Sequence, residues 1–208
     1  RYVRRAGIDE STLERLQYQG ARPDIVGLNY YVTSDRFLDH RLARYPASTH
    51  GGNGRQRYAD IEAARADAAR IRGHADVLRE AWERYRLPVA ITEAHIGCTR
   101  EEQLRWLRDA WGGATAALEA GADVRAVTVW ALLGSVDWDS LVTREAGHYE
   151  PGVFDVRGGR PRPTALAGAC RSLAAAGTID RPAVTGAGWW TRPPVSTPGQ
   201  RPVMVVGA

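Results

Sequence analysis

Three apolar segments alternate along the chain with segments whose apolar residues recur at every third or fourth position. The apolar segments cover residues 23–32, 87–93 and 124–133. Parallel strands are buried on both faces, so they lose polar alternation and read as short continuous apolar stretches. The alternation therefore predicts three βα units of a parallel sheet. Three strands cannot close a barrel, so we expect the sequence to be part of a longer protein that supplies the others.

The helical spacing occurs in four segments: residues 9–19, 59–86, 100–120 and 163–176. In the first, either Asp9 or Ser11 is the expected N-cap, and Leu13 and Leu16 are expected to face inward.

The third helical segment begins with a capping sequence. Thr99 is its predicted N-cap and Glu102 the partner in a capping box. Its apolar stripe is expected to be buried and consists of Leu104, Leu107, Trp111 and Leu118.

Three further segments show neither period clearly. We expect residues 33–57, which contain a cluster of glycines, to form a long loop, and long loops in compact domains are usually functional. Residues 149–156 suggest a small hairpin. Residues 177–200 hold four prolines and the pair Trp189-Trp190, which is typical of a linker or of an extended tail packed on a surface.

The amino-acid composition excludes several classes of chemistry and partner. The 208 residues are 44% hydrophobic and 25% charged, which suits a globular core. Every basic residue is an arginine, so lysine-based chemistry is excluded within this sequence. The net charge is only +4 and the acidic residues are interspersed, so we expect no nucleic-acid partner despite a pI near 9.4.

Cysteine and histidine positions predict no metal. Cys98 and Cys170 lie far apart and have no ligand at zinc spacing, and a disulfide framework is equally unexpected. Four histidines without ligand spacing are expected at the surface: His40, His50, His74 and His148. No signal peptide and no apolar stretch of transmembrane length is present, so we expect no membrane partner and a cytoplasmic location.

Glu93 is the candidate catalytic residue. It ends the apolar segment 87–93, and in an α/β barrel the carboxyl end of a strand faces the active site. A carboxylate there is a candidate catalyst. It could equally cap a loop or pair with one of the many arginines.

The three strand ends resemble, in order, motifs of glycoside hydrolase family 1. The sixth-strand motif D-F-x-G-x-N-Y-Y is matched by residues 24–31, the seventh-strand I-T-E-N-G by residues 91–93, and the eighth-strand W-S-L-L-D-N-F-E-W by residues 130–138. Residues 152–155 and 162–164 resemble the hairpin and the segment before the last helix. The resemblance covers about residues 10–175 and implies the C-terminal part, strands six to eight, of an α/β (β/α)8 TIM barrel.

The resemblance also implies roles for individual residues. Glu93 would be the nucleophile of a retaining β-glycosidase, which hydrolyses O-glycosidic bonds, and Tyr31 would hold it ionised by a hydrogen bond. Carbohydrate would be the partner, contacted by Asn29, Trp130, Asp137 and Trp138. His95 follows the nucleophile closely and could tune it or contact substrate; a structural or exposed histidine is the alternative. The barrel would need no cofactor.

Several positions depart from the family pattern. Ala94-His95 replaces Asn-Gly after the nucleophile, and the sugar-reading Glu of the eighth strand is the shorter Asp137. The acid/base carboxylate of the family lies in an Asn-Glu-Pro motif, which this sequence does not contain. Glu150-Pro151 lacks the preceding Asn and follows the last strand. We therefore expect this fragment alone to be inactive.

The last residues suggest a second domain. Residues 201–208 read as the first strand of a Rossmann domain entering its glycine turn. With the preceding tail, they look like a fusion to a domain resembling dTDP-4-dehydrorhamnose reductases. The expected organisation is a barrel part over residues 1–176, a linker over 177–200 and a truncated Rossmann start, for which NAD(P) is a possible cofactor. The alternative function is a non-catalytic sugar-binding barrel that serves the fused reductase; the oligomeric state stays open.

Overall fold

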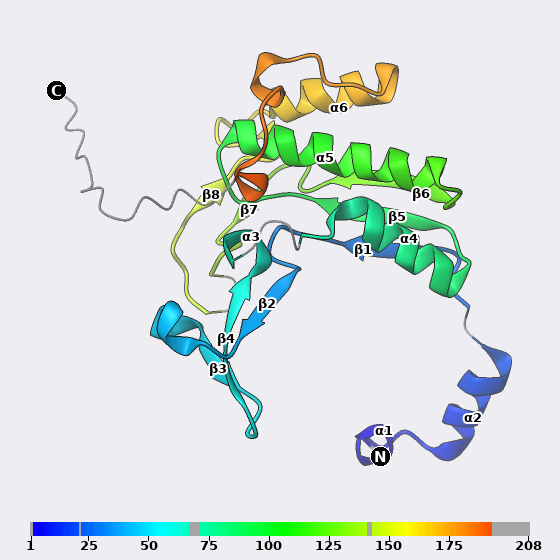
Figure 1. The fold of residues 1–208 in the computed structure, drawn as a ribbon. Coiled ribbons are helices and arrows are strands. Elements are labelled where there is room, and N and C mark those ends of the chain that lie inside the picture. The colour runs from blue at the N-terminus through cyan, green and yellow to red at the C-terminus, as the bar shows by residue number, and fades with distance from the viewer. Residues whose placement is uncertain (1, 21, 67–70, 141–142, 193–208) are drawn as a thin grey trace.

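A three-stranded parallel sheet forms the centre of the computed structural model, which describes residues 2–20, 22–66, 71–140 and 143–192. Its strands lie in the order β1 (Val26–Asn29), β5 (Val89–Ala94) and β6 (Val124–Val129) (Figure 1). The predicted parallel sheet of βα units is therefore confirmed.

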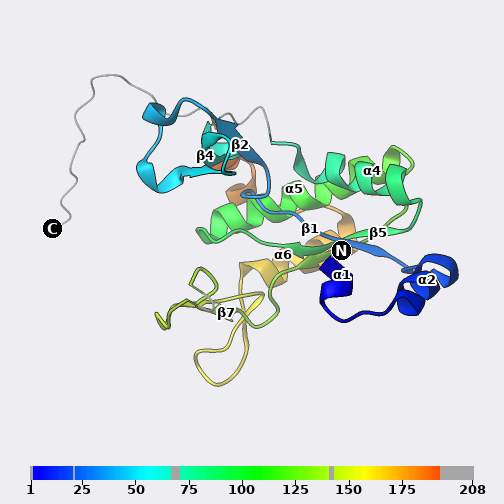
Figure 2. The same cartoon turned by 90° about the horizontal axis from the view of Figure 1, so that it is seen from below.

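Three helices cover one face of this sheet. They are α4 (Gly73–Tyr85), α5 (Arg100–Glu119) and α6 (Ala165–Ala176), and Figure 2 shows α4 and α5 running alongside the strands. Val89 and Ile91 of β5 are fully buried against them, as an apolar central strand requires. On the opposite face Asn29, Thr92 and Thr128 are exposed.

Helix α5 begins as predicted, but only one of the two hydrogen bonds of the predicted capping box forms. The Thr99 hydroxyl accepts a hydrogen bond from the Glu102 backbone N–H at 3.5 Å. The Glu102 carboxylate does not return to Thr99 and instead accepts bonds from Arg105 and Arg192. Leu118, expected in the buried stripe, is 55% exposed in the last turn.

Residues 36–62 form a second sheet where we expected a loop and the start of a helix. It is antiparallel and consists of β2 (Arg36–Asp39), β3 (His50–Gly52) and β4 (Arg57–Glu62) in the order β2-β4-β3, followed by the short helix α3 (Ala63–Ala66). The helix predicted over 59–86 is wrong at its start, where Ala59 and Ile61 are buried at a spacing of two, the period of a strand; α3 and the later helix Gly73–Tyr85 lie within the predicted range.

The N-terminal helices α1 (Tyr2–Arg5) and α2 (Glu10–Gln19) lie apart from the sheet (Figure 1). Asp9 caps α2 by accepting a hydrogen bond from the Thr12 N–H at 2.7 Å. No residue of α2 is buried, and Leu16, expected to face inward, is 55% exposed.

After β6 the chain forms two small ladders instead of the single hairpin expected over 149–156. Strand β7 (Ser135–Val136) pairs with β8 (Tyr149–Glu150), and β9 (Phe154–Asp155) pairs with β10 (Arg162–Pro163). The predicted Rossmann strand, residues 201–208, falls outside the described residues. Among the described helices, none combines the length and apolar character needed to cross a membrane.

Candidate active site

The ends of the three parallel strands meet at one edge of the sheet. Asn29 of β1 lies opposite Glu93 of β5 in the strand register. Beyond the end of β6, the Trp130 N–H donates to the Ala94 carbonyl at 3.3 Å. The residues at the predicted strand ends therefore share the carboxyl edge of the sheet, where barrel enzymes place their active sites.

A bulge in β5 sets the direction of Glu93. The β1 register passes from Leu28–Ile91 to Asn29–Glu93, and the β6 register passes from Ile91 directly to Ala94. The extra residue at Thr92 interrupts the pairing, and bulges of this kind re-aim side chains beside active sites.

Tyr31 and Glu93 are in direct contact. The Tyr31 hydroxyl donates a short hydrogen bond to Oε2 of Glu93, and the pair is partly buried. Burial, followed by the bond to Glu93, raises the pKa of Tyr31 well above its usual value of 10. Tyr31 therefore remains a protonated donor to Glu93 at neutral pH.

Asn29 lies beside this pair. The Thr92 hydroxyl donates a short hydrogen bond to Oδ1 of Asn29, so the side-chain amide nitrogen is turned away from Thr92. Both residues are exposed on the sheet face that the helices leave open. An amide in this position can hydrogen-bond a hydroxyl-rich ligand.

Two tryptophans lie together at the β6 side. The ring centroids of Trp130 and Trp138 are 5.2 Å apart and the planes are inclined by 44°. Trp138 is 42% exposed, and Nε1 of Trp130 has no hydrogen-bond partner within the part of the chain that the structure describes. Aromatic faces of this kind can bury the apolar surface of a sugar.

The carboxylate of Asp137 is occupied by the loop that follows it. It accepts hydrogen bonds from the N–H groups of Ala146, Gly147 and His148 at 2.7–2.9 Å. These bonds hold the pKa of Asp137 below its usual value. The expected sugar contact of Asp137 stays a prediction, and the bonds give this side chain a structural role.

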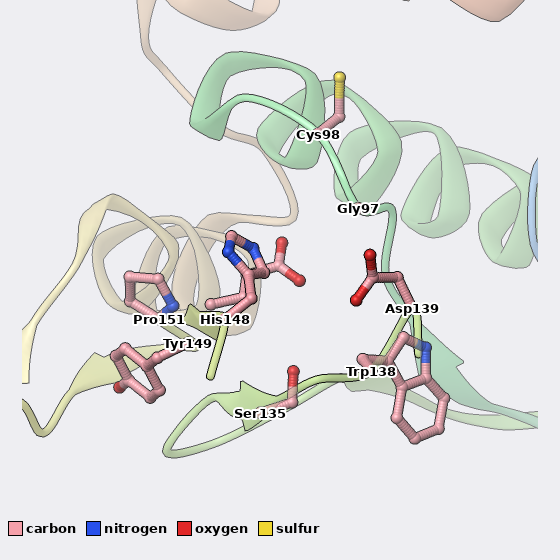
Figure 3. Close-up of a pocket in the computed structure, with 9 residues that line it drawn as sticks. Gly97, Cys98, Ser135, Trp138, Asp139, His148, Tyr149 and Pro151 are labelled. Atoms are coloured by element: carbon pink, nitrogen blue, oxygen red, sulfur yellow. The ribbon is translucent and has the colours of Figure 1, made fainter. Parts of the chain in front are cut away.

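A cavity of about 440 Å³ opens beside Trp138. Figure 3 shows Asp139 and His148 on opposite sides of it. The other lining residues are Gly97, Cys98, Ser135, Trp138, Tyr149, Glu150 and Pro151. Mixed aromatic and hydroxyl or carboxylate side chains are suited to a polar ligand with apolar faces.

Glu150 in the cavity wall was missed as a site residue because it follows the last strand. Its Oε2 lies 3.2 Å from Nε2 of His95, and its Oε1 accepts a 2.5 Å bond from the Gln103 amide. His95 is 8% exposed. His95 therefore joins the end of β5 to the β7–β8 ladder, and no local pattern could show a pair 55 residues apart.

No group of three or more His, Cys, Asp or Glu side chains is placed to hold a metal ion within the described ranges. The predicted residues instead form two groups. Tyr31, Glu93 and Asn29 lie at the ends of β1 and β5, and Trp130, Asp137 and Trp138 follow β6. His95 contacts the cavity wall through Glu150.

The fold is similar to β-glucosidases. A mutant β-glucosidase derived from a hyperthermophilic tetrameric structure matches with a TM-score of 0.53 and 17% identity, over 88% of this chain and 41% of that one. A Thermotoga maritima β-glucosidase in complex with deoxynojirimycin matches with a TM-score of 0.51 and 20% identity, over 81% and 38%. A family 1 β-glucosidase of that organism in complex with isofagomine lactam matches with a TM-score of 0.50 and 18% identity, over 81% of this chain and 38% of that one.

The described chain therefore has an α/β fold that matches part of the barrel of these β-glucosidases, and it spans about two fifths of their length. No protein-family model matches the sequence. No curated protein matches it either. Identities of 20% or less establish the fold alone.

Proposed function

We propose that this chain contributes the nucleophile side of a retaining β-glycosidase active site. Glu93 is the nucleophile, Tyr31 is its hydrogen-bond partner, and a carbohydrate is the substrate. The proposal includes Asn29 as a contact to sugar hydroxyls and Trp130 and Trp138 as apolar faces.

One observation carries the proposal: the hydrogen bond between Tyr31 and Glu93 at the carboxyl ends of neighbouring parallel strands. A carboxylate that attacks an anomeric carbon must be charged, and a phenol that stays protonated favours the charged form. Retaining enzymes pair such a nucleophile with a second carboxyl group about 5–5.5 Å away, which protonates the leaving oxygen.

The second carboxyl group of the family motif is not in these 208 residues, since they contain no Asn-Glu-Pro. Turnover is therefore proposed for the protein that carries the rest of the barrel. There the leaving group departs as Glu93 forms a glycosyl ester. Water then hydrolyses the ester with the acid acting as base.

The first prediction concerns Glu93→Ala in that full-length protein. Turnover of an activated aryl β-glycoside should fall by roughly 10⁴-fold or more, as for other nucleophile deletions. Added azide should restore part of the rate and yield the α-glycosyl azide, because it attacks from the vacated side. Steady-state kinetics and product NMR measure both.

The matched control is Glu83→Ala, which removes an exposed carboxylate of α4. Its rate should equal that of the wild type. If Glu93→Ala retained full turnover, Glu93 would have no part in the chemistry.

A second candidate is a sugar-binding barrel without turnover, and the neighbouring rings of Trp130 and Trp138 favour it, because they could bury a sugar face without any chemistry. In that case the barrel would serve a fused NAD(P)-dependent nucleotide-sugar reductase. Wild-type protein would then be inactive on every aryl glycoside. Ligand affinity would depend on Trp130 and Trp138 more than on Glu93, and calorimetric titration of the variants with sugars separates the two functions.

A further inference from the structure

Residues 181–192, which we call the strap, pack against α5 after the last helix. The strap contains the short helical turns η4 (Pro182–Val184) and η5 (Trp189–Thr191). Val184 is 4% exposed, and the Arg108 guanidinium donates hydrogen bonds to the carbonyls of Val184 and Gly186. These contacts make the strap part of the folded domain.

Glu102 anchors the strap through its charge. This carboxylate is buried at the start of α5 and accepts bonds from the Trp189 N–H at 3.3 Å and the Arg192 guanidinium at 2.9 Å. Arg105 donates to the same carboxylate at 2.9 Å. A buried carboxylate is stable only with such partners, so Glu102 and the strap depend on one another.

Trp190 anchors the strap by apolar burial. It is 2% exposed and meets the ring of Trp106 edge to face at 5.0 Å. Trp106 in turn stacks on Tyr30 with centroids 6.1 Å apart. Val32 and Ile96 complete this buried group, which we call the aromatic cluster.

The aromatic cluster includes residues close along the chain to both members of the Tyr31–Glu93 pair. Tyr30 and Val32 enter it from the end of β1, so they fix the backbone on both sides of Tyr31, whose own side chain meets Glu93 instead. Ile96 enters it three residues after Glu93. The cluster therefore holds both chain segments that bring Tyr31 and Glu93 together.

We propose that the strap positions Tyr31 against Glu93, with Trp190 and Glu102 as its anchoring side chains. Both are positioning residues, since neither contacts the Tyr31–Glu93 pair. Any consequence for catalysis rests on the function proposed above, but the positioning itself does not.

The test follows the ionisation of Tyr31 in the full chain. Burial and Glu93 keep Tyr31 protonated far above pH 10. In Trp190→Ala, water should reach the pair, and the pKa of Tyr31 should fall toward its usual value of 10. NMR of tyrosine labelled at the Cζ carbon, assigned with Tyr31→Phe and titrated from pH 8 to 11, should show Tyr31 ionising in the variant and not in the wild type. Trp190→Phe, which keeps an aromatic ring, should restore most of the wild-type behaviour.

The matched control is Leu173→Ala in α6, which also opens a buried position but lies in the other core cluster, formed mainly by α4, α5, α6 and β5. It should lower the melting temperature without changing the titration of Tyr31. Equal changes in Leu173→Ala and Trp190→Ala, or none in Trp190→Ala, would overturn the proposal.

If Trp190→Ala does not fold, Glu102→Gln replaces it. This variant keeps both tryptophans and weakens only the charged anchor, so Tyr31 should ionise only in part by pH 11, and a titration identical to that of the wild type contradicts the proposal. Activity is a separate readout. If the protein shows no glycosidase turnover but Trp190→Ala still lowers the pKa of Tyr31, this inference stands and the proposed function is wrong.

Discussion

The carboxyl edge of the parallel sheet has two halves, one at the ends of β1 and β5 and one that follows β6, and different kinds of contact stabilise them. The β1–β5 half, with Tyr31 and Glu93, stands on the aromatic cluster, whose Trp106 and Trp190 are each 2% exposed. The β6 half, with Trp130 and Trp138, stands on loops joined by hydrogen bonds and on the two-residue strands β7 and β8.

The exposures reflect this difference. Leu132, Leu133 and Trp138 in the β6 half are between 42% and 61% exposed. Few buried apolar contacts make a segment prone to local opening, whereas a packed core opens only with the whole domain. We expect a rigid half that carries the candidate nucleophile and a more adaptable half that contacts the ligand.

The largest expected effect comes from Gly152→Ala in the β6 half. A Cβ at Gly152 would lie 2.0 Å from the Ala131 carbonyl oxygen and 2.5 Å from the Gly134 nitrogen, so the backbone must move. We expect a loss of about 3 kcal/mol in the free energy of unfolding, the upper end of the usual overpacking range. Urea denaturation followed by tryptophan fluorescence measures it.

The comparison predicts where Gly152→Ala acts. The bond from the Val153 N–H to the Ala131 carbonyl should lose hydrogen-exchange protection, while the amides of β1 and β5 keep theirs. Gly158→Ala is the control, because no atom lies within 4 Å of the added methyl group. Uniform loss of protection in both halves would remove the distinction between them.

A smaller effect in the β1–β5 half should come from His74. It is 3% exposed and contacts Tyr30 and Trp106 in ring-to-ring geometry. Burial lowers its pKa from 6.5 to about 4, so at pH 5 the unfolded chain binds a proton that the folded chain does not. Stability should be complete above pH 6.5 and fall toward pH 4, with a loss of about 2 kcal/mol at pH 5.

His74→Phe removes this titration and keeps an aromatic ring. The difference in unfolding free energy between wild type and variant, measured by urea denaturation at pH 7 and pH 5, isolates the histidine from the carboxylates. If that difference did not change between the two pH values, the acid sensitivity would not come from the β1–β5 half.

Much of the β1–β5 half could be predicted from the sequence. The strands are continuous apolar segments, and the positions just beyond them place Tyr31 near Glu93. His74 was wrongly expected at the surface. It is buried because Gly113 lets α4 and α5 approach so closely that a Cβ there would lie 2.7 Å from the His74 Cβ.

The sequence says less about the β6 half and about the sheet β2-β4-β3. The partners of Asp137 are backbone N–H groups, which leave no mark in side-chain patterns. The pair His95–Glu150 joins residues far apart in the chain. In β4 the alternation of buried and less buried positions from Tyr58 to Glu62 is short and follows a glycine-rich stretch. The helical spacing that continues beyond it therefore led us to assign these residues to a helix.

The smallest and most local effect is expected from Asp137→Asn. The carboxylate accepts three backbone N–H bonds with two oxygens, while an amide offers one oxygen and turns an NH₂ group toward a donor. The amides of Ala146, Gly147 and His148 should exchange roughly tenfold faster or more, since they lose a charged acceptor.

The same loop should depend on pH, because its three hydrogen bonds lower the pKa of Asp137. At pH values above the usual aspartate pKa the bonds should hold the loop, and as the pH falls below that range the loop should be released. Hydrogen exchange detected by mass spectrometry follows these amides, and Asp139→Asn, which changes a neighbouring exposed carboxylate, is the control. If Asp137→Asn and Asp139→Asn gave the same exchange, the loop would not depend on this carboxylate and the β6 half would need another support.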